Sequence, residues 1–245
     1  MNSFYIEGTG AVNATASLLP EEARHACQVL RLRAGEAVYA VDAAGKRFAA
    51  EIAEISKTGC AVLLREELSD NEAPVRITLY QGMPKADKLD FIVQKATELG
   101  AAYVSPVKME RCVVKLDEKD GEKRRERLEK IAREAAKQCK RANAPEILPP
   151  QTWKQLAARM RAHDLLLAPW EDATGYGMRA ARQEFPDAKD IGIVIGPEGG
   201  ISAEEAAALT ELGARIVTLG PRILRTETAA VAACTMAMLL WGDIG

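Results

Sequence analysis

Two short motifs in the C-terminal third of the chain carry most of the residues that could do chemistry. The first is Gly196-Pro-Glu-Gly-Gly200, and the second is Gly220-Pro-Arg-Ile-Leu-Arg-Thr-Glu-Thr228. Each follows an apolar, strand-like run, and in open α/β sheets ligands bind at the carboxyl ends of the strands. Glycine lets a backbone approach a ligand without a Cβ in the way, and proline stiffens a loop in advance. The two motifs therefore predict a pocket whose backbone groups bind a nucleotide-like cofactor.

Two charged residues stand out within the second motif, Arg225 and Glu227. Charged groups in a Gly/Pro-rich loop before an apolar helix are costly unless they are paired or used. Glu227 in the first turn of the helix would favour the helix dipole, and Arg225 could pair with it or with Glu198, so a structural role is compatible with the sequence. In a functional role, Glu227 would accept a proton directly or through water, and Arg225 would favour a deprotonated substrate. The sequence does not identify the general base.

The elements that must position these motifs follow an α/β pattern from residue 74 onward. Strands are expected at 75–80, 103–107, 164–168, 191–195 and 214–219. Helices are expected at 88–99, 123–141, 202–213 and 227–241. Asp87 and Ser202 are suitable N-caps, and Gly100 and Gly213 are suitable helix terminators. Strands separated by helices predict a mainly parallel sheet that is covered on both faces.

The first 70 residues have a different pattern, which predicts a small β-rich domain. Strand-like runs occur at 37–41, 48–55 and 60–65, with turns at 42–45 and 56–59 and one helix at 20–30. The polar, acidic stretch 66–74 has the composition of a linker. The sequence therefore predicts two domains, at 1–70 and 74–245.

Composition and charge exclude several classes of protein. The chain has 245 residues, of which 48% are hydrophobic and 28% charged, with a net charge of −2, as in an ordinary globular protein. No P-loop and no G-x-G-x-x-G follows a strand, which argues against kinases, ATPases and dinucleotide-binding enzymes. Five scattered cysteines and two histidines indicate neither a disulfide framework nor a metal site. No membrane span or leader is apparent, so we expect a cytoplasmic protein.

One region is locally basic despite the acidic total. Residues 123–141 contain nine Lys or Arg against three Glu, and their apolar residues follow a helical stripe. Such a helix can simply be exposed to solvent, with Glu–Lys and Glu–Arg ion pairs four residues apart. Alternatively, its basic face can bind RNA.

Several motifs together resemble one known family. The matching runs are His25-Ala-Cys-Gln-Val-Leu-Arg31, Lys95-Ala-Thr-Glu-Leu-Gly100, Glu110-Arg-Cys112, Glu134-Ala-Ala-Lys-Gln-Cys-Lys-Arg141, Pro145-Glu-Ile147 and the two glycine-rich motifs. In their order and spacing they resemble the SPOUT superfamily of S-adenosylmethionine-dependent RNA methyltransferases. Within it they resemble the family of ribosomal RNA small subunit methyltransferase E. The resemblance covers nearly the whole chain.

The resemblance implies a fold, a reaction and an assembly. The C-terminal domain would contain a deep trefoil knot, the N-terminal domain would be a PUA-like β-barrel, and the protein would be a homodimer. The reaction would methylate N3 of a uridine in 16S rRNA of the small ribosomal subunit, with S-adenosylmethionine as cofactor and no metal. A related SPOUT enzyme acting on tRNA or on a ribose 2′-hydroxyl, and a non-catalytic RNA-binding or ribosome assembly factor, are the alternatives.

The resemblance also implies site residues. The cofactor-binding residues would be Leu167, Ala168, Pro169, Ile195, Gly196, Pro197, Gly200, Leu219, Gly220, Ile223, Leu224, Arg225 and Thr228. Arg225 and Glu227 are the candidate catalytic residues on the charge argument given above, not on the resemblance. Among surface cations, we expect RNA contacts from Arg31, Arg33, Arg111, Lys115 and Arg141. Trp170 could stack on a base, although a buried anchor fits its position equally well.

Overall fold

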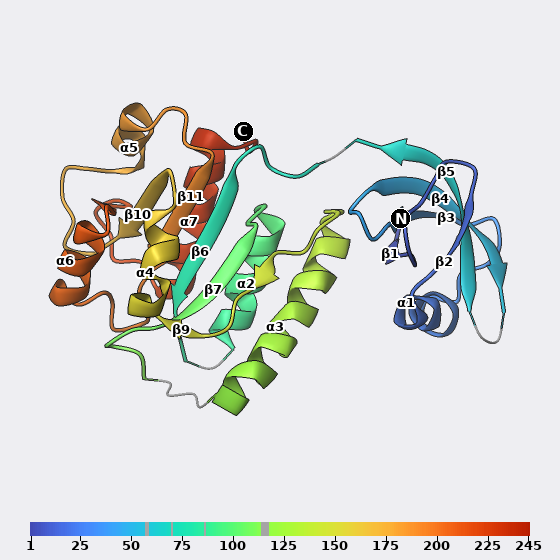
Figure 1. Cartoon of the computed structure of the whole chain (residues 1–245), viewed down its shortest axis with the longest axis horizontal. Helices are drawn as coiled ribbons and strands as arrows, with labels where there is room; N and C mark the ends of the chain where they lie inside the picture. The colour runs from blue at the N-terminus through green and yellow to red at the C-terminus, as the bar shows by residue number, and fades with distance from the viewer. Residues whose placement is uncertain (57–58, 70, 86, 114–117) are drawn as a thin grey trace. The chain divides into compact units, whose positions relative to one another are not determined.

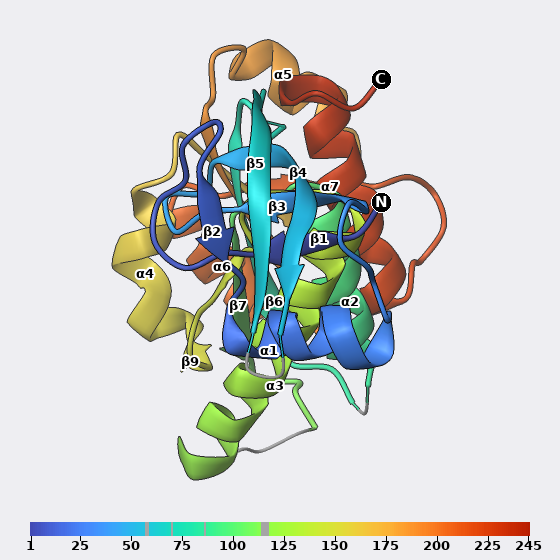
Figure 2. The same cartoon turned by 90° about the vertical axis from the view of Figure 1, so that its right-hand side faces the viewer.

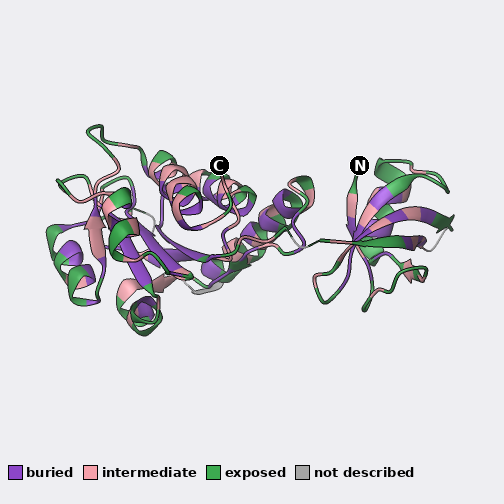
Figure 3. Ribbon diagram, turned by 90° about the horizontal axis from the view of Figure 1, so that it is seen from above, coloured by how far each residue is buried: buried purple, intermediate pink, exposed green. Residues whose placement is uncertain are grey.

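The computed structural model of the chain describes residues 1–56, 59–69, 71–85, 87–113 and 118–245, with the side chains of 118 and 119 left out. The chain divides into two compact units (Figure 1). Unit 1 contains Met1–Glu72 together with Ala136–Asn143, and unit 2 contains Ala73–Ala135 together with Ala144–Gly245. Each unit buries its own hydrophobic core, with buried residues concentrated in the strands (Figure 3).

Unit 1 is built on a mostly antiparallel sheet (Figures 1 and 2). Its strands are β1 (Ser3–Tyr5), β2 (Thr15–Ser17), β3 (Ala37–Val41), β4 (Arg47–Ile55) and β5 (Cys60–Leu68), in the spatial order β1-β3-β4-β5-β2. β1 pairs with β3 in parallel and the other pairs are antiparallel. In β4, Phe48, Ala50 and Ile52 are buried while the residues between them are not. This alternation is what a sheet with one covered face requires.

The predicted strands of unit 1 are confirmed as β3, β4 and β5, but β5 continues to Leu68, into the stretch with linker composition. β1 and β2 were not predicted, because three residues are too few to show a period. The predicted helix 20–30 is a short α1 (Pro20–Arg24) continued by a π-helical turn, η1 (His25–Val29). The predicted turn at 56–59 lies partly outside the described residues.

Unit 2 contains a parallel sheet, as the alternation of strands and helices predicts. Its strands are β6 (Arg76–Gly82), β7 (Tyr103–Lys108), β8 (Glu146–Ile147), β9 (Gln151–Thr152), β10 (Leu165–Pro169), β11 (Asp190–Ile195) and β12 (Arg215–Val217). The spatial order is β12-β10-β11-β6-β7-β8, with β9 also pairing with β7. All of these pairs are parallel. The carboxyl ends of β12, β10 and β11 therefore meet at one edge of the sheet.

Helices cover both faces of this sheet (Figure 1). They are α2 (Lys88–Glu98), α3 (Glu118–Gln138), α4 (Trp153–Arg161), α5 (Met178–Glu184), α6 (Ala203–Glu211) and α7 (Thr226–Trp241). Leu165 and Leu167 of β10 pack into the same core as residues of α2, α3, α5 and α7. Leu166 and Ala168 belong to a second core with residues of α4 and α6. Alternate residues of one strand thus bury against different helices, which makes β10 apolar throughout.

The helix ends follow the predicted signals with one exception. Ser202 and Glu205 form the predicted capping box of α6. Gly100 and Gly213 have φ of +86° and +94°, as expected of helix terminators. Asp87 is the N-cap residue of α2, as predicted, but its side chain makes no capping hydrogen bond. Among the described helices, none is both long and apolar enough to cross a membrane.

Candidate functional site

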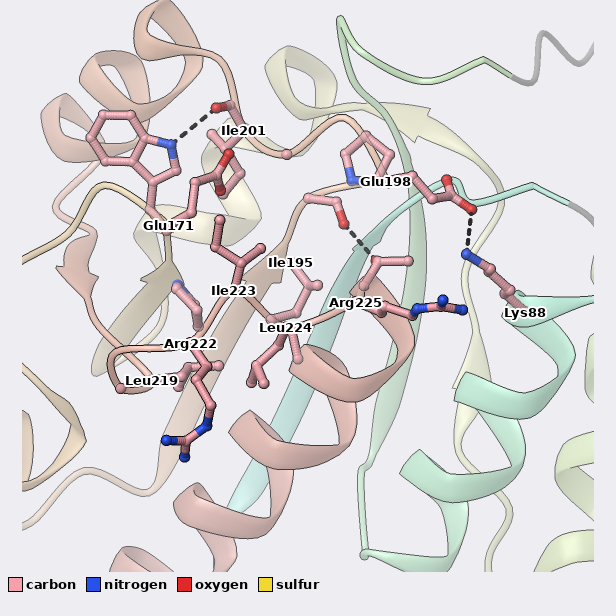
Figure 4. Close-up of a pocket in the computed structure, with 18 of the residues that line it drawn as sticks. Lys88, Glu171, Ile195, Glu198, Ile201, Leu219, Arg222, Ile223, Leu224 and Arg225 are labelled. Atoms are coloured by element: carbon pink, nitrogen blue, oxygen red, sulfur yellow. Dashed lines mark hydrogen bonds and ion pairs between the residues drawn. The ribbon is translucent and has the colours of Figure 1, made fainter.

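A cavity of about 410 Å³ opens at the carboxyl ends of β10, β11 and β12 (Figure 4). This is the size and the position typical of small-molecule sites in α/β folds. Three loops and the ends of α2 and α7 supply its walls. The lining residues are Lys88, Pro169, Trp170, Glu171, Ile195, Gly196, Pro197, Glu198, Gly200, Ile201, Leu219, Gly220, Pro221, Arg222, Ile223, Leu224, Arg225, Thr226 and Ala229.

Two glycines let the loop after β11 fold closely on itself. A Cβ added to Gly196 would lie 2.8 Å from the carbonyl carbon of Gly200 and 2.9 Å from the amide nitrogen of Ile201. Gly200 has a φ of +74°, and a Cβ there would collide with the Glu171 carboxylate. Both positions therefore require glycine, in agreement with the prediction that this loop presents bare backbone.

Two buried hydrogen bonds of the Thr226 hydroxyl connect this loop and the end of β6 to the start of α7. The Thr226 hydroxyl donates to the carbonyl oxygen of Gly196 at 2.6 Å and accepts from the Gln81 amide at 2.8 Å. Gln81 is fully buried at the end of β6. Sequence reasoning missed both residues. A threonine directly before an apolar helix was a signal for Thr226, whereas no local pattern distinguishes a strand-end Gln81.

Three charged side chains form an ionic cluster, which consists of Lys88, Glu198 and Glu227. The Lys88 ammonium lies 3.0 Å from the Glu198 carboxylate and 3.4 Å from Oε2 of Glu227. Glu198 also accepts hydrogen bonds from the backbone N–H of Lys85, at 3.0 and 3.3 Å. Figure 4 shows the Lys88–Glu198 pair beside the Arg225 guanidinium. The cluster joins α2, the loop after β11 and the first turn of α7.

The electrostatics of the cluster follow from these contacts. Burial raises the pKa of the Glu198 carboxyl, but backbone N–H groups and the Lys88 ammonium outweigh burial, so the net pKa is lowered. The hydrogen bond to Glu198 raises the pKa of Lys88. Oε2 of Glu227 is buried and makes no hydrogen bond within the described part of the chain. The Lys88–Glu198 pair is therefore charged at neutral pH.

The structure brings together most of the residues that the sequence assigned to the cofactor. Those lining the cavity are Pro169, Ile195, Gly196, Pro197, Gly200, Leu219, Gly220, Ile223, Leu224 and Arg225. Leu167 and Ala168 are instead fully buried in β10, one in each core. Thr228 is exposed on α7 and does not line the cavity. The Trp170 indole lines the cavity and donates to the carbonyl oxygen of Ile201 at 3.0 Å.

The predicted RNA contacts lie in different surroundings. Arg31 and Arg33 are exposed in the loop after η1 of unit 1, and Arg31 has an unusual φ of +53°. Arg111 in unit 2 is exposed and donates to the carbonyl oxygen of Gly199 at 2.9 Å, so it touches the glycine-rich loop. Lys115 lies outside the described residues.

Arg141 differs from the other predicted RNA contacts because its guanidinium is covered. It is 6% exposed and bonded to the Glu72 carboxylate within unit 1, with a closest N–O distance of 2.5 Å. A buried, paired guanidinium stabilises the packing of segment 136–143, and it does not present its charge to a partner. We therefore leave Arg141 out of the proposed RNA surface.

Comparison with known proteins relates the chain to RNA methyltransferases. Residues 71–238 match the RNA methyltransferase domain family, and residues 18–64 match the RNA methyltransferase PUA domain. Ribosomal RNA small subunit methyltransferase E of Bacillus subtilis is 38% identical over 238 residues, which cover 94% of this chain and 93% of that protein.

Comparison with solved structures also relates the chain to methyltransferases. The crystal structure of ribosomal RNA small subunit methyltransferase E from Neisseria gonorrhoeae, bound to S-adenosyl methionine, superimposes with a TM-score of 0.86 at 32% identity over 100% of both chains. A Legionella pneumophila protein described as a methyltransferase in complex with SAM has a TM-score of 0.86 at 32% identity, over 99% of this chain and 98% of that chain.

Proposed function

The chain belongs to the RNA methyltransferase family, and from that premise we propose that it transfers a methyl group from S-adenosylmethionine to N3 of a uridine in 16S rRNA of the small ribosomal subunit. The observation that carries the proposal is the cavity at the ends of β10, β11 and β12, whose walls contain ten of the residues expected to bind the cofactor. The relatives named ribosomal RNA small subunit methyltransferase E match nearly the whole chain.

The residues of the cavity fit S-adenosylmethionine. The cofactor has an adenine ring, a ribose and a charged methionine end, and when bound it supplies a methyl group activated on a sulfonium sulfur. Ile195, Leu219 and Leu224 offer apolar surface, and the glycine-rich loops expose backbone donors and acceptors. Because a Cβ at Gly196 would collide with backbone and one at Gly200 with the Glu171 carboxylate, the loop after β11 presents bare backbone at the cavity. We place the cofactor against these three loops.

Uridine N3 carries a proton that must leave for N3 to act as a nucleophile. We assign Glu227 as the proton acceptor. It does not itself line the cavity, but it directly follows the lining residues Arg225 and Thr226 in the first turn of α7, and its side chain is 19% exposed. The N3–H bond would break and the proton would pass to the carboxylate. The electron pair left on N3 would form the new N–CH₃ bond as the S–CH₃ bond breaks, and the sulfur would keep that bonding pair as a neutral thioether. Arg225 lines the cavity and is exposed, so its charge can stabilise the negative charge that spreads onto the uracil oxygens.

RNA capture is assigned to both units. Arg31 and Arg33 of unit 1 and Arg111 of unit 2 are exposed cations, which suit contacts to phosphates. Arg111 also touches the loop that lines the cavity, so a phosphate bound there would lie near the reacting base.

Two features of the assembly complete the proposal. We propose that the loops between β11 and α7 form a trefoil knot, supported by the hydrogen bond between Gly196 and Thr226, which are 30 residues apart in the chain. We also propose a homodimer, supported by the large apolar side chains that α2 and α7 expose, Phe91 at 45% and Leu239 at 58%. The domains would be residues 1–70 and 74–245, and light scattering of the purified protein tests the dimer.

The test of the reaction is methyl transfer from labelled S-adenosylmethionine to small ribosomal subunits from a strain that lacks the endogenous enzyme. We expect N3-methyluridine at one site, identified by mass spectrometry of the nucleosides. Labelling of tRNA or of a ribose 2′-hydroxyl would assign the chain to a different RNA methyltransferase. Cofactor binding without any labelling would favour a non-catalytic RNA-binding or assembly factor.

A further inference from the structure

Lys88 occupies a position that the stability of its own helix does not explain. It is the first residue of α2, where the positive end of the helix dipole disfavours a cation. Its two carboxylate partners come from other parts of the chain, Glu198 from the loop after β11 and Glu227 from α7. A lysine that lines the cavity and joins two loops of the site at the unfavourable end of a helix indicates a role in the site.

The contacts form a chain that ends at the proposed proton acceptor. The backbone N–H of Lys85 fixes the Glu198 carboxylate, which in turn holds the Lys88 ammonium at 3.0 Å. The ammonium lies 3.4 Å from Oε2 of Glu227, close enough for an ion pair, yet this oxygen makes no hydrogen bond in the described residues. Lys88 therefore holds the carboxylate by charge rather than by a well-directed hydrogen bond.

We propose that Lys88 is a positioning residue for methyl transfer, whose ammonium group holds the Glu227 carboxylate in the orientation that meets the N3 proton of uridine. This inference rests on the proposed function. Arg225, the other cation of the cavity near this point, has no ion pair within the described part of the chain, which leaves it available for the substrate. The two cations thus have different tasks, since Lys88 orients the enzyme's own carboxylates and Arg225 faces the base.

The test compares Lys88→Met with Lys95→Met in the full chain. Lys95 is on the same helix and pairs with Glu98 at 2.8 Å, and the side chains of this pair are 33% and 29% exposed, against 31% and 28% for Lys88 and Glu198. Lys95 does not line the cavity. The control therefore removes an equally exposed lysine from α2 without disturbing the site.

For Lys88→Met we expect kcat at saturating RNA and S-adenosylmethionine to fall on the order of 10²-fold, the usual cost of misplacing a reacting group by about 1 Å. The KM for RNA and the affinity for S-adenosylmethionine, measured by calorimetry, stay near the wild-type values. Lys88→Arg recovers most of the loss, because a guanidinium can bridge the same carboxylates. Lys95→Met keeps the wild-type kcat.

A second measurement needs neither cofactor nor RNA. The Glu198 carboxyl signal is followed by carbon NMR in the free protein and assigned with Glu198→Gln. Since Lys88 contributes to the lowered pKa of Glu198, the signal in Lys88→Met titrates at a higher pH than in the wild type. Among the described residues near this face, Lys85, Glu171, Arg222, Arg225 and Glu227 also carry charge, and the variant leaves them in place.

Three outcomes would overturn the inference. An increase in the KM for RNA alone would make Lys88 a substrate-binding residue. A lower melting temperature with unchanged kcat would make it a structural one. An unchanged Glu198 titration would show that the ionic cluster does not form in solution. If wild-type protein methylates its RNA and Lys88→Met does so equally well, the positioning role is wrong and the proposed function stands. If the wild type transfers no methyl group, both fail together.

Discussion

The parallel sheet of unit 2 gathers titratable side chains near both ends of its strands, and the two groups differ in how they are paired. Near the amino ends of β10 and β11, the Tyr80 hydroxyl lies 2.8 Å from Nε2 of His163, whose Nδ1 lies 2.6 Å from the Asp190 carboxylate. Asp190 also pairs with Arg76. We call this the amino-end network. At the carboxyl ends lies the ionic cluster of Lys88, Glu198 and Glu227.

By residue type, the amino-end network looks more like catalytic machinery, since Tyr, His and Asp in series resemble a proton relay. Its environment excludes that role. The His163 side chain is 4% exposed, Tyr80 is fully buried, and a Cβ on Gly192 would lie 2.6 Å from the His163 ring. Burial raises the pKa of Tyr80 to about 12, so the phenol stays protonated. Residue chemistry alone therefore does not identify a site. Tyr80 and His163 lie in the interior, whereas Lys88 and Glu198 line a cavity.

Glu227→Gln gives the largest expected effect and tests the carboxyl-end half of the comparison. Removing a proton acceptor lowers kcat by about 10²- to 10⁴-fold, while the amide keeps the size of the side chain. Initial rates on small ribosomal subunits measure the effect, and calorimetry with S-adenosylmethionine checks that the cofactor still binds. Near-wild-type turnover would remove Glu227 from the mechanism.

His163→Ala tests the amino-end network. It leaves the Tyr80 hydroxyl and the Asp190 carboxylate without their shared partner, so we expect a loss of about 1–3 kcal/mol in the free energy of unfolding. Urea denaturation measures the loss. Affinity for S-adenosylmethionine and kcat should stay unchanged under conditions where the variant is folded. A selective loss of kcat would give the amino-end network a functional role and remove the contrast between the two ends.

Gly200→Ala and Gly213→Ala are a matched pair of variants, one at the cavity and one away from it. Both glycines have positive φ, +74° and +94°, so alanine strains either backbone by about 1–2 kcal/mol. Gly213 has open space around it and does not line the cavity, whereas Gly200 does line it. We expect an approximately tenfold higher Kd for S-adenosylmethionine in Gly200→Ala only. Equal Kd values would show that the loop after β11 does not bind the cofactor.

The sequence predicted the parallel sheet and the strands that end at the cavity, because these depend on local patterns. Ten of the lining residues followed from the family resemblance. Apolar runs, glycine turns and the Ser202 capping box each span only a few residues. Thr228 was expected at the cavity, but it lies on the exposed face of α7, where Thr226 points inward instead. A shift of two residues turns a helical side chain by about 200°, and this is a detail that motif matching does not resolve.

The sequence analysis did not find pairs of residues that are far apart in the chain and contact each other only in the folded protein. Gln81 and Thr226 are 145 residues apart, and Lys88 and Glu198 are 110 apart, so no spacing connects them. Arg141 shows the opposite failure. A cation at the end of a basic run was expected at the surface, yet Glu72 pairs with it in the interior of unit 1. Local charge counts do not reveal which cations are already neutralised by distant carboxylates.

Glu198→Gln gives the smallest expected effect and separates charge from packing at the carboxyl end. Because the pKa of Glu198 is lowered in the folded protein, its carboxylate stabilises the fold above the ordinary pKa of glutamate, and this contribution is lost as the pH falls through the lowered value. The pair with Lys88 is partly exposed, so we expect at most about 1 kcal/mol. Unfolding by urea at pH 7 should favour the wild type over Glu198→Gln, and the difference should disappear in acid. A difference that persists at low pH would mean that Glu198 stabilises the loop by packing, as the buried Tyr80–His163 pair of the amino-end network does.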